Sequence, residues 1–418
     1  MATSLTIQTE AQDPTDGGKP PVPGLLQIWS VAGPVCRALP WFGELELGRE
    51  PPALVLDDPR TSRRHCKLSF DGALWIVEDL DSRNGTYIDG ARVQGRMRLD
   101  EGQVLRVGHC LFLAQSDLRP REGGVLVMGD VIVGAGFGAV LQRVAARAAA
   151  GEALLLTGPT GAGKLLAARR FHELAGDGGP FVQVSHKRLT EDSPDAALRE
   201  AVRVAGSGTL VVAGVDELGS AAQALLLPLC EPGARPRLCV LAREDLRAAV
   251  RAGRLREDLY FRLHAVLVEV WPLTRRFEEI GFHIHHELAA SQLQAQPSLI
   301  EHCVRLPWPG NVRELRAEVR AAGAAAQLEG LVEVAARHLR AHVGEVEEPT
   351  RGKAIVSAEK LADPERVQAA LRAEGGNVRA AARALGVHRN QLRRWLTHHG
   401  VESKSVDTEV DDTATDEA

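Results

Sequence analysis

The clearest chemical signal is a glycine-rich run over residues 158–164, GPTGAGK, which lies between a predicted strand, Ala153–Thr157, and a predicted helix, Leu165–Leu174. In such a P-loop the backbone N–H groups surround phosphate oxygens, the helix N-terminus adds a favourable dipole, and the lysine reaches the outer phosphates. The predicted phosphate site consists of Gly158, Pro159, Thr160, Gly161, Ala162, Gly163, Lys164 and Leu165. Leu165 stands where the motif has the Ser or Thr that ligates Mg²⁺, so ATP or ADP is expected without this protein ligand for the metal.

A second set of phosphate-binding side chains lies nearer the N-terminus, in three segments predicted to be loops between short strands. These segments are Gly48-Arg49, Ser62-Arg63-Arg64-His65 and the run 81–86, which reads DSRNGT and contains Asn84-Gly85, a hairpin signal. Arginine presents a planar fork of donors that fits phosphate oxygens, and Ser or Thr hydroxyls can complete the set. Arginine-rich loops on an arginine-rich protein are the simpler alternative.

The joint spacing of these segments, over residues 25–118, resembles the forkhead-associated (FHA) domain, a β-sandwich that binds phosphothreonine peptides. The resemblance implies that Arg49, Ser62 and Arg63 hold the phosphate or adjacent backbone. It places Asn84 on the peptide main chain with Thr86 nearby, and His65 as a brace for the Ser62 loop. The implied partner is a phosphothreonine-containing protein or a phosphorylated segment of this chain.

Around the P-loop, apolar runs alternate with helical stretches rich in Ala, Leu and Arg, which is typical of a parallel sheet. The runs 255–263 (LREDLYFRL) and 306–315 (LPWPGNVREL) resemble signature stretches of the AAA+ domain of sigma-54-dependent activators, the bacterial enhancer-binding proteins. The resemblance covers residues 125–345. It implies that Arg256 and Arg262 are arginine fingers acting on a neighbouring subunit and that Arg313 is a sensor at the nucleotide. Salt bridges on helices would explain any one of these arginines but not the set.

The chain departs from this family at the residues that position the Mg²⁺ ion and the attacking water. The family reads GTLFLDEIGEL, whereas residues 208–218 read GTLVVAGVDEL, so Ala213 and Gly214 replace the two acids in ungapped register. Asp216-Glu217 falls three residues late, and a bulge in the strand would bring it back. Ser185 replaces the usual Asn after the second strand, and Ala242-Arg243 replaces the first sensor, Thr-Asn. Poor hydrolysis of bound ATP is expected, with the module serving assembly or nucleotide sensing.

The loop with which the family engages sigma-54, GAFTGA, has no counterpart at its usual place. Gly208 follows Ser185 by only 208 − 185 = 23 positions, too few to include this loop. The run 134–139, GAGFGA, resembles it superficially but precedes the P-loop, and we interpret it as part of the entry to the nucleotide pocket. These features argue against contact with RNA polymerase and sigma-54.

The C-terminal block, residues 357–401, is short and helical. Asp363-Pro364 predicts a helix start, and residues 361–400 contain seven Arg against three acids. Residues 375–396 resemble the Fis-type helix-turn-helix that ends sigma-54 activators, although a small arginine-rich helical cap is the alternative. The resemblance implies a dimeric DNA-binding module. Its predicted DNA-binding residues are Arg389, Asn390, Gln391, Arg393 and Arg394.

The composition limits the possible classes of function. The chain of 418 residues has a formal net charge of −5, which excludes a uniformly basic protein that coats nucleic acid. Six dispersed Cys, without zinc spacing, and the lack of an apolar run of membrane length predict a cytoplasmic protein with no protein-built metal site, and any Mg²⁺ would come with the nucleotide. A disordered leader, 1–24, and an acidic disordered tail, 402–418, flank the three domains. The predicted fold is multidomain: a β-sandwich, an α/β P-loop AAA+ domain with a helical lid, and a small all-α helix-turn-helix.

Together these predictions indicate a homo-oligomeric, dimeric or ring-forming, DNA-binding transcriptional regulator of the enhancer-binding type. Its input would be phosphothreonine, and its AAA+ module would bind ATP or ADP. The first alternative is an ATP-driven activator of sigma-54 RNA polymerase. The second is a phosphoprotein-binding scaffold, which predicts tight phosphopeptide binding without a DNA footprint.

Overall fold

A computed structural model of the chain describes residues 20–51, 54–70, 74–176, 178–185, 194–243 and 246–341, and six single positions between 367 and 385. The chain divides into two compact units, Met1–Glu345 and Val346–Ala418. Within the described residues, no helix has the length and apolar character needed to cross a membrane.

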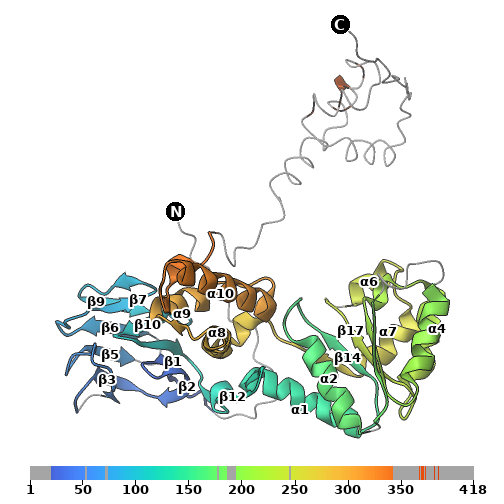
Figure 1. The fold of residues 1–418 in the computed structure, drawn as a ribbon, viewed down its shortest axis with the longest axis horizontal. Coiled ribbons are helices and arrows are strands. Elements are labelled where there is room, and N and C mark those ends of the chain that lie inside the picture. The colour runs from blue at the N-terminus through green and yellow to red at the C-terminus, as the bar shows by residue number, and fades with distance from the viewer. Residues whose placement is uncertain are drawn as a thin grey trace. The chain divides into compact units, whose positions relative to one another are not determined.

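The first part of the larger unit is a sandwich of two β-sheets (blue to cyan in Figure 1). One sheet has the strand order β2-β1-β11-β10-β7-β8 and the other β4-β3-β5-β6-β9. Side chains that alternate along the strands, among them Leu47, Leu68, Val77 and Phe112, form the fully buried core between the sheets. The strands are β1 (Gly24–Ser30), β2 (Gly33–Pro40), β3 (Gly43–Gly48), β4 (Leu54–Val55), β5 (Cys66–Phe70), β6 (Trp75–Asp79), β7 (Thr86–Ile88), β8 (Ala91–Arg92), β9 (Arg96–Leu99), β10 (Val104–Val107) and β11 (Cys110–Gln115).

The expected hairpin at Asn84-Gly85 is wrong. The strands on either side of it, β6 and β7, belong to different sheets, so this loop crosses from one sheet to the other. The two-residue turn lies at Asp89-Gly90, between the antiparallel strands β7 and β8, where φ is +50° and +81°. Asn-Gly and Asp-Gly both tolerate left-handed backbone, so the dipeptide alone does not show which loop is a hairpin turn. The pairing of the flanking strands decides it.

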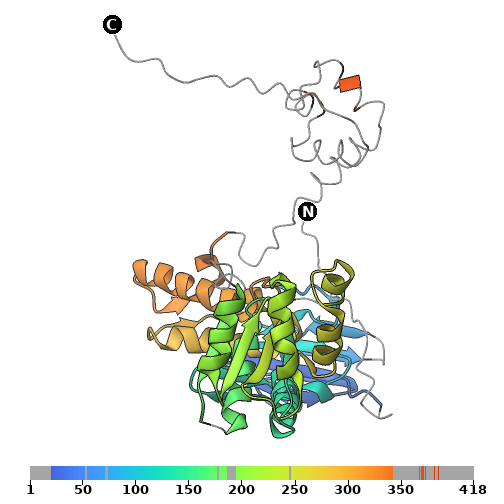
Figure 2. The same cartoon turned by 90° about the vertical axis from the view of Figure 1, so that its right-hand side faces the viewer.

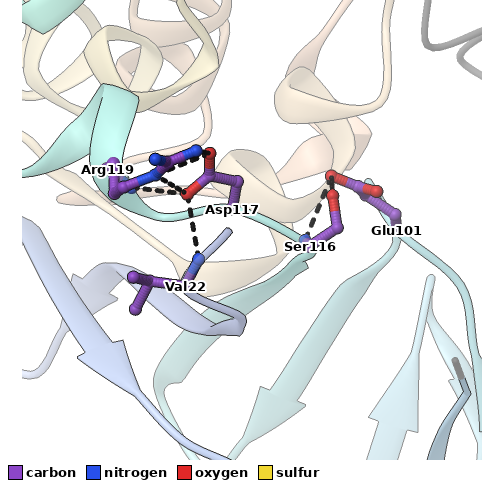
Figure 3. Close-up of polar contacts among 5 residues, drawn as sticks. All are labelled: Val22, Glu101, Ser116, Asp117 and Arg119. Carbon is purple, nitrogen blue, oxygen red and sulfur yellow. Dashed lines mark hydrogen bonds and ion pairs between the residues drawn. The ribbon is translucent and has the colours of Figure 1, made fainter. Parts of the chain in front are cut away.

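A short joint connects the sandwich to the rest of the unit (Figure 3). The Asp117 carboxylate accepts a hydrogen bond from the Val22 backbone N–H, 3.2 Å away, and forms an ion pair with Arg119 at 2.6 Å. Ser116 donates to Glu101 at 3.1 Å. The joint leads into a turn of 3₁₀-helix, η1 (Arg119–Arg121), and the antiparallel pair β12 (Val125–Met128) and β13 (Val131–Gly134).

The central part is a five-stranded parallel sheet in the order β15-β16-β17-β14-β18, with helices on both faces (Figure 2). Alternate residues of each strand face opposite sides. Leu210 and Val240 pack into a core shared with α4 and α7, and Val211 and Cys239 pack against α1 and α2. The strands are β14 (Leu154–Thr157), β15 (Phe181–Ser185), β16 (Thr209–Ala213), β17 (Arg237–Leu241) and β18 (Leu267–Glu269), and the helices α1 (Ala135–Ala149), α2 (Lys164–Ala175), α4 (Pro194–Ala205), α5 (Ser220–Leu226), α6 (Arg247–Arg251) and α7 (Glu257–His264).

A helical lid follows the sheet, and it packs against the sandwich as well (Figure 1). It comprises α8 (Ile280–Ala289), α9 (Pro297–Val304), α10 (Asn311–Leu328) and the short parallel pair β19 (Gln294–Ala295) and β20 (Glu333–Val334). Ile28 and Trp29 of β1 share one buried cluster with Ile284 and Ile300 of the lid, and Arg106 pairs with the nearly buried Glu301 at 2.9 Å. Sandwich and lid thus bury apolar surface against each other, which favours their moving together.

In the smaller unit the structure describes six helical positions, and Val367, Ala381 and Leu385 among them are buried.

Candidate functional site

The glycine-rich loop leaves the carboxyl end of β14 and enters α2, as predicted. Its glycines have left-handed or related backbone, with φ of +139° at Gly158, +77° at Gly161 and +109° at Gly163, the N-cap of α2. A side chain at Gly158 would place Cβ 2.2 Å from the Val270 carbonyl oxygen, and one at Gly161 would place it 2.0 Å from the Gly310 carbonyl oxygen. Only glycine fits these two positions, because of both the backbone angle and the neighbouring carbonyls.

Lys164 is the cation at the start of α2, and it is half-buried. Its Nζ donates hydrogen bonds to the carbonyl oxygens of Gly158 at 2.5 Å and Pro159 at 2.8 Å, within its own loop. Burial, followed by the nearby guanidinium groups of Arg243 and Arg313, lowers the pKa of Lys164 to about 8. Three cationic side chains therefore gather at this loop.

The lid reaches the loop through the first turn of α10. The side-chain amide of Asn311 donates to the Thr160 carbonyl at 2.9 Å, and its oxygen accepts the Leu273 backbone N–H at 2.7 Å. Arg313 follows on the same turn, with its Cβ 3.2 Å from where a Cβ on Gly161 would stand. The structure thus brings the predicted sensor, Arg313, to the predicted P-loop.

A second link from lid to loop is fully buried. Arg276 donates to the Ala162 carbonyl at 2.8 Å and pairs with Glu279 at 3.3 Å. Its guanidinium lies over the Phe137 ring, which also packs against Gly163. Phe137 belongs to the run 134–139, so this run lines the loop, as the sequence predicts.

The residues that would hold Mg²⁺ are apolar. Strand β16 pairs with both neighbours in unbroken register, Ser185 opposite Ala213 on one side and Leu241 opposite Ala213 on the other. Ala213 and Leu165 both pack against the same apolar cluster, formed by α1, α2 and that face of the sheet. A divalent cation requires oxygen ligands. At these two positions the side chains offer no oxygen ligand for a divalent cation, whereas the backbone of the glycine-rich loop is shaped as in a phosphate-binding loop.

The alternative of a bulge that restores Asp216-Glu217 is wrong. The register of β16 is continuous from Thr209 to Ala213. Gly214 then takes a left-handed conformation, φ +77°, and begins a 3₁₀ turn over Val215–Glu217. Asp216 and Glu217 lie in that turn, beyond the end of the strand.

The predicted arginine fingers lie at the start of α7 and on this helix, and each forms an ion pair with a nearby carboxylate. Arg256 precedes the helix and binds the Asp258 carboxylate at 2.7 and 3.0 Å, and Arg262 pairs with Glu231. Phe261 is 62% exposed beside them. A pocket lined by Arg256, Glu257, Asp258 and Phe261 opens at this place.

In the sandwich, the loops that carry the predicted phosphopeptide residues are joined by hydrogen bonds. The Arg49 N–H donates to the Ser62 carbonyl at 3.0 Å, and the Asn84 side chain donates to the Arg60 carbonyl at 2.6 Å. The side chains of Arg49 and Arg63 are exposed, and neither forms an ion pair with a described carboxylate. By contrast, Arg64 binds Glu46 through two hydrogen bonds.

Buried residues support these loops from below. His65 accepts the Ser62 N–H at Nδ1, 3.0 Å away, and its Nε2 lies 3.2 Å from the Gly85 carbonyl, so it braces both loops as predicted. Burial lowers the pKa of His65, which favours the neutral ring. Thr86 is fully buried and donates its hydroxyl to Asp79 at 2.6 Å. Thr86 therefore holds the loop in place, while Arg49, Arg63 and Asn84 face solvent.

The predicted DNA-binding residues, Arg389, Asn390, Gln391, Arg393 and Arg394, lie outside the described residues, as do the tail and residues 1–19 of the predicted leader. The end of that leader is described: the Val22 N–H donates to Asp117, the Val22 carbonyl accepts the Leu118 N–H, and Gly24 begins β1.

Comparison with known proteins agrees with this organisation. Residues 45–108 match the FHA domain, residues 136–273 the sigma-54 interaction domain, and residues 362–397 the Fis family of bacterial regulatory proteins. The probable regulatory protein HrpS of the pathogenicity locus of Pseudomonas syringae pv. syringae is 31% identical over 201 residues, which cover 40% of this chain and 67% of HrpS. The chain belongs to the family of sigma-54-dependent regulators.

Other members of the family align over a longer stretch. The C4-dicarboxylate transport transcriptional regulatory protein DctD of Pseudomonas aeruginosa is 30% identical over 307 residues, 64% of this chain. The chain spans 63% of the length of DctD. The crystal structure of NtrX from Brucella abortus in complex with ATP has a TM-score of 0.45 at 26% identity and covers 68% of this chain and 71% of that one. The predicted fold class is confirmed, including the Fis-type C-terminal module.

Two residues of this sigma-54-dependent regulator gain importance from the structure. Asn311 connects the lid to the P-loop, and the positive charge of Arg243 lowers the pKa of Lys164. Asn311 lies within the run 306–315, which resembles a signature stretch of the family, so the sequence did contain a signal for its importance. The sequence shows Arg243 as a departure from the family pattern, but it does not indicate that the Arg243 guanidinium acts on the Lys164 ammonium group.

Proposed function

We propose that this protein is a DNA-binding transcriptional regulator that receives a phosphothreonine signal and contains an AAA+ module that binds ATP or ADP but hydrolyses ATP poorly. The observation that carries the proposal is the state of the nucleotide pocket. The backbone of its glycine-rich loop, with Lys164 and Arg313, is suited to phosphate, whereas Leu165 and Ala213 are packed into an apolar cluster. Phosphoryl transfer depends on positioned charge, which these two residues do not provide.

The phosphothreonine input is supported by the two exposed arginines of the sandwich. Arg49 and Arg63 lie on loops that are hydrogen-bonded to each other, so their backbones are held before any ligand binds. Guanidinium groups on such held backbones, without an ion pair to any described carboxylate, favour a phosphate ligand, through charge-assisted hydrogen bonds. The partner would be another phosphorylated protein or a phosphorylated segment of this chain.

DNA recognition is assigned to residues 362–397, which match the Fis family. In the major groove, arginine pairs well with guanine, and asparagine or glutamine with adenine. We therefore assign Arg389, Asn390, Gln391, Arg393 and Arg394 to DNA, and infer a homo-oligomer that is at least dimeric, on a two-fold site. Substitution of Arg393 and Arg394 by Ala should weaken salt-sensitive binding in gel-shift assays, and unchanged binding would contradict this assignment.

The experiment that tests the proposal as a whole is transcription from a footprinted target promoter, reconstituted with and without sigma-54. We expect regulation that depends on the footprint and on the phosphorylated partner, and that does not require hydrolysable ATP. Activation that requires both sigma-54 and ATP hydrolysis would favour the alternative, an ATP-driven activator of sigma-54 RNA polymerase. Tight phosphopeptide binding without any footprint would favour a scaffold.

A further inference from the structure

We propose that the pocket binds its nucleotide as a metal-free anion, with the guanidinium of Arg243 supplying the positive charge that Mg²⁺ supplies in a metal-dependent site. The inference rests on the proposed binding of ATP or ADP. It goes further by naming the form of the ligand and the residue that selects it.

The first step is the position of Arg243 in the sheet. Strand β17 lies between β14, which leads into the P-loop, and β16, which ends at Ala213. The backbone N–H of Ala242 donates to the Leu156 carbonyl of β14 at 2.9 Å, and that of Gly214 donates to the Leu241 carbonyl at 3.3 Å. Arg243 therefore leaves the sheet at the carboxyl edge, between the P-loop strand and the strand that has lost its acid, where ligands bind in open parallel sheets.

The second step is the loss of both protein positions that would hold a metal. Leu165 and Ala213 come from different elements and pack against one apolar cluster. Neither can provide an oxygen ligand, and refilling either position with a carboxylate or hydroxyl would place a polar group at the edge of that cluster. A metal ion at the nucleotide would therefore lack a side-chain ligand both from α2 and from β16.

The third step is the balance of charge around Lys164. Burial lowers the pKa of Lys164, and the guanidinium groups of Arg243 and Arg313 lower it further. Arg243 is exposed, and no described carboxylate forms an ion pair with it. Three cations held near one another repel, and a polyanion relieves that repulsion.

The fourth step is the chemistry of the ligand. ATP or ADP without Mg²⁺ carries more negative charge than its magnesium complex, so three cations match the free nucleotide better. A guanidinium also offers a planar fork of donors that binds two phosphate oxygens at once. Arg243 can therefore neutralise the outer phosphates where the metal would have done so, without ordering an attacking water.

The test is calorimetric titration of the full chain with ATP and with ADP, in excess EDTA and in excess Mg²⁺. We expect the affinity in EDTA to equal or exceed the affinity in Mg²⁺. Arg243→Asn should weaken binding in EDTA by on the order of tenfold to a hundredfold, as expected for lost hydrogen bonds between charged groups. The matched control is Arg251→Asn, an exposed arginine on α6, which should bind nucleotide like the unaltered protein.

A further variant sharpens the test. The double variant Arg243→Asn with Ala213→Asp removes the guanidinium and offers a carboxylate at the end of β16. We expect binding that now improves when Mg²⁺ is added. The unaltered protein is also titrated with inorganic tripolyphosphate in EDTA. We expect it to bind tripolyphosphate much more weakly than ATP, which would show that the ligand is a nucleotide rather than any polyphosphate.

The possible failures are distinguishable. Nucleotide binding that is lost in EDTA and unaffected by Arg243→Asn would overturn the inference and leave nucleotide binding itself intact. Absence of binding to ATP and ADP under both conditions would overturn the inference together with the proposed nucleotide function. Thermal melting of each variant identifies any loss of binding that reflects unfolding.

Discussion

The chain has two sites suited to phosphate, and they were assembled differently. In the sandwich, the proposed binding groups are exposed side chains from separate loops, and buried His65 and Thr86 hold those loops. In the α/β part the proposed phosphate cradle is the backbone, because glycines at positions 158, 161 and 163 adopt angles and contacts that other residues cannot.

We propose that this difference lets the nucleotide site keep a phosphate-binding backbone while it lacks the side chains that hydrolysis requires. A cradle made of backbone survives the loss of a few side chains, because the fold depends on the glycines and on the apolar cluster rather than on catalytic acids. Ala213 and Leu165 add to that cluster. In the sandwich, by contrast, the binding groups are the side chains themselves, so losing them would abolish recognition.

The strongest way to break this comparison is to remove a binding side chain from the sandwich. Arg49→Ala should weaken binding of a phosphothreonine peptide by on the order of a hundredfold, because bonds between a guanidinium and phosphate are charge-assisted. Isothermal titration with the phosphorylated and unphosphorylated peptide measures the effect. Arg64→Ala is the matched control, since Arg64 is exposed in the next loop but paired with Glu46. Equal binding of both peptides to the unaltered protein would refute the assignment.

A smaller effect is expected from the corresponding change in the nucleotide pocket, where the loop amides remain. Lys164→Ala should weaken ATP and ADP binding by about tenfold or somewhat more, the effect of losing one cation from the cradle. Fluorescence titration with labelled nucleotide measures it. Arg170→Ala, on the exposed side of the same helix, should leave affinity unchanged. A fall of equal size in both variants would show that binding is not at the P-loop.

Substitution of Thr86 tests which residues of the sandwich bind the peptide and which only hold the binding loops in place. Thr86→Val keeps the shape but removes the hydroxyl that donates to Asp79, so it should lower the free energy of unfolding by roughly 1–3 kcal/mol. Peptide affinity should fall far less than in Arg49→Ala. Thr86→Ser retains the donor and should stay close to the unaltered protein in chemical denaturation. A large loss of affinity with unchanged stability would place Thr86 on the peptide instead.

The smallest effect concerns pH and the nucleotide pocket. Because the pKa of Lys164 in the free protein is about 8, the lysine is charged below that pH and loses its proton above it. Nucleotide phosphates favour the charged form, so affinity should decline by up to about tenfold between roughly pH 7 and pH 9, with proton uptake on binding. Calorimetry in buffers of different ionisation enthalpy measures the uptake. Arg243→Asn should reduce uptake near pH 8, since Arg243 lowers this pKa; uptake that does not change would argue against their proximity.

Much of the fold was predictable from the sequence, because local signals and the fold agreed. The P-loop lies between a strand and a helix as expected, and His65 braces the loop that the spacing indicated. The Asn84-Gly85 hairpin was wrong because a turn signal does not reveal which sheet the next strand joins. The packing of the lid against β1 and the neighbours of Arg243 depend on contacts distant in sequence, so no local pattern could predict them.

The most direct test of the central claim, that this core holds a nucleotide without breaking it, is a single-turnover assay with radiolabelled ATP and protein in excess, in the presence of Mg²⁺. The account predicts that ATP is recovered intact from the protein after many minutes, at the rate of the uncatalysed control. Magnesium-dependent release of phosphate that disappears in Lys164→Ala would contradict it.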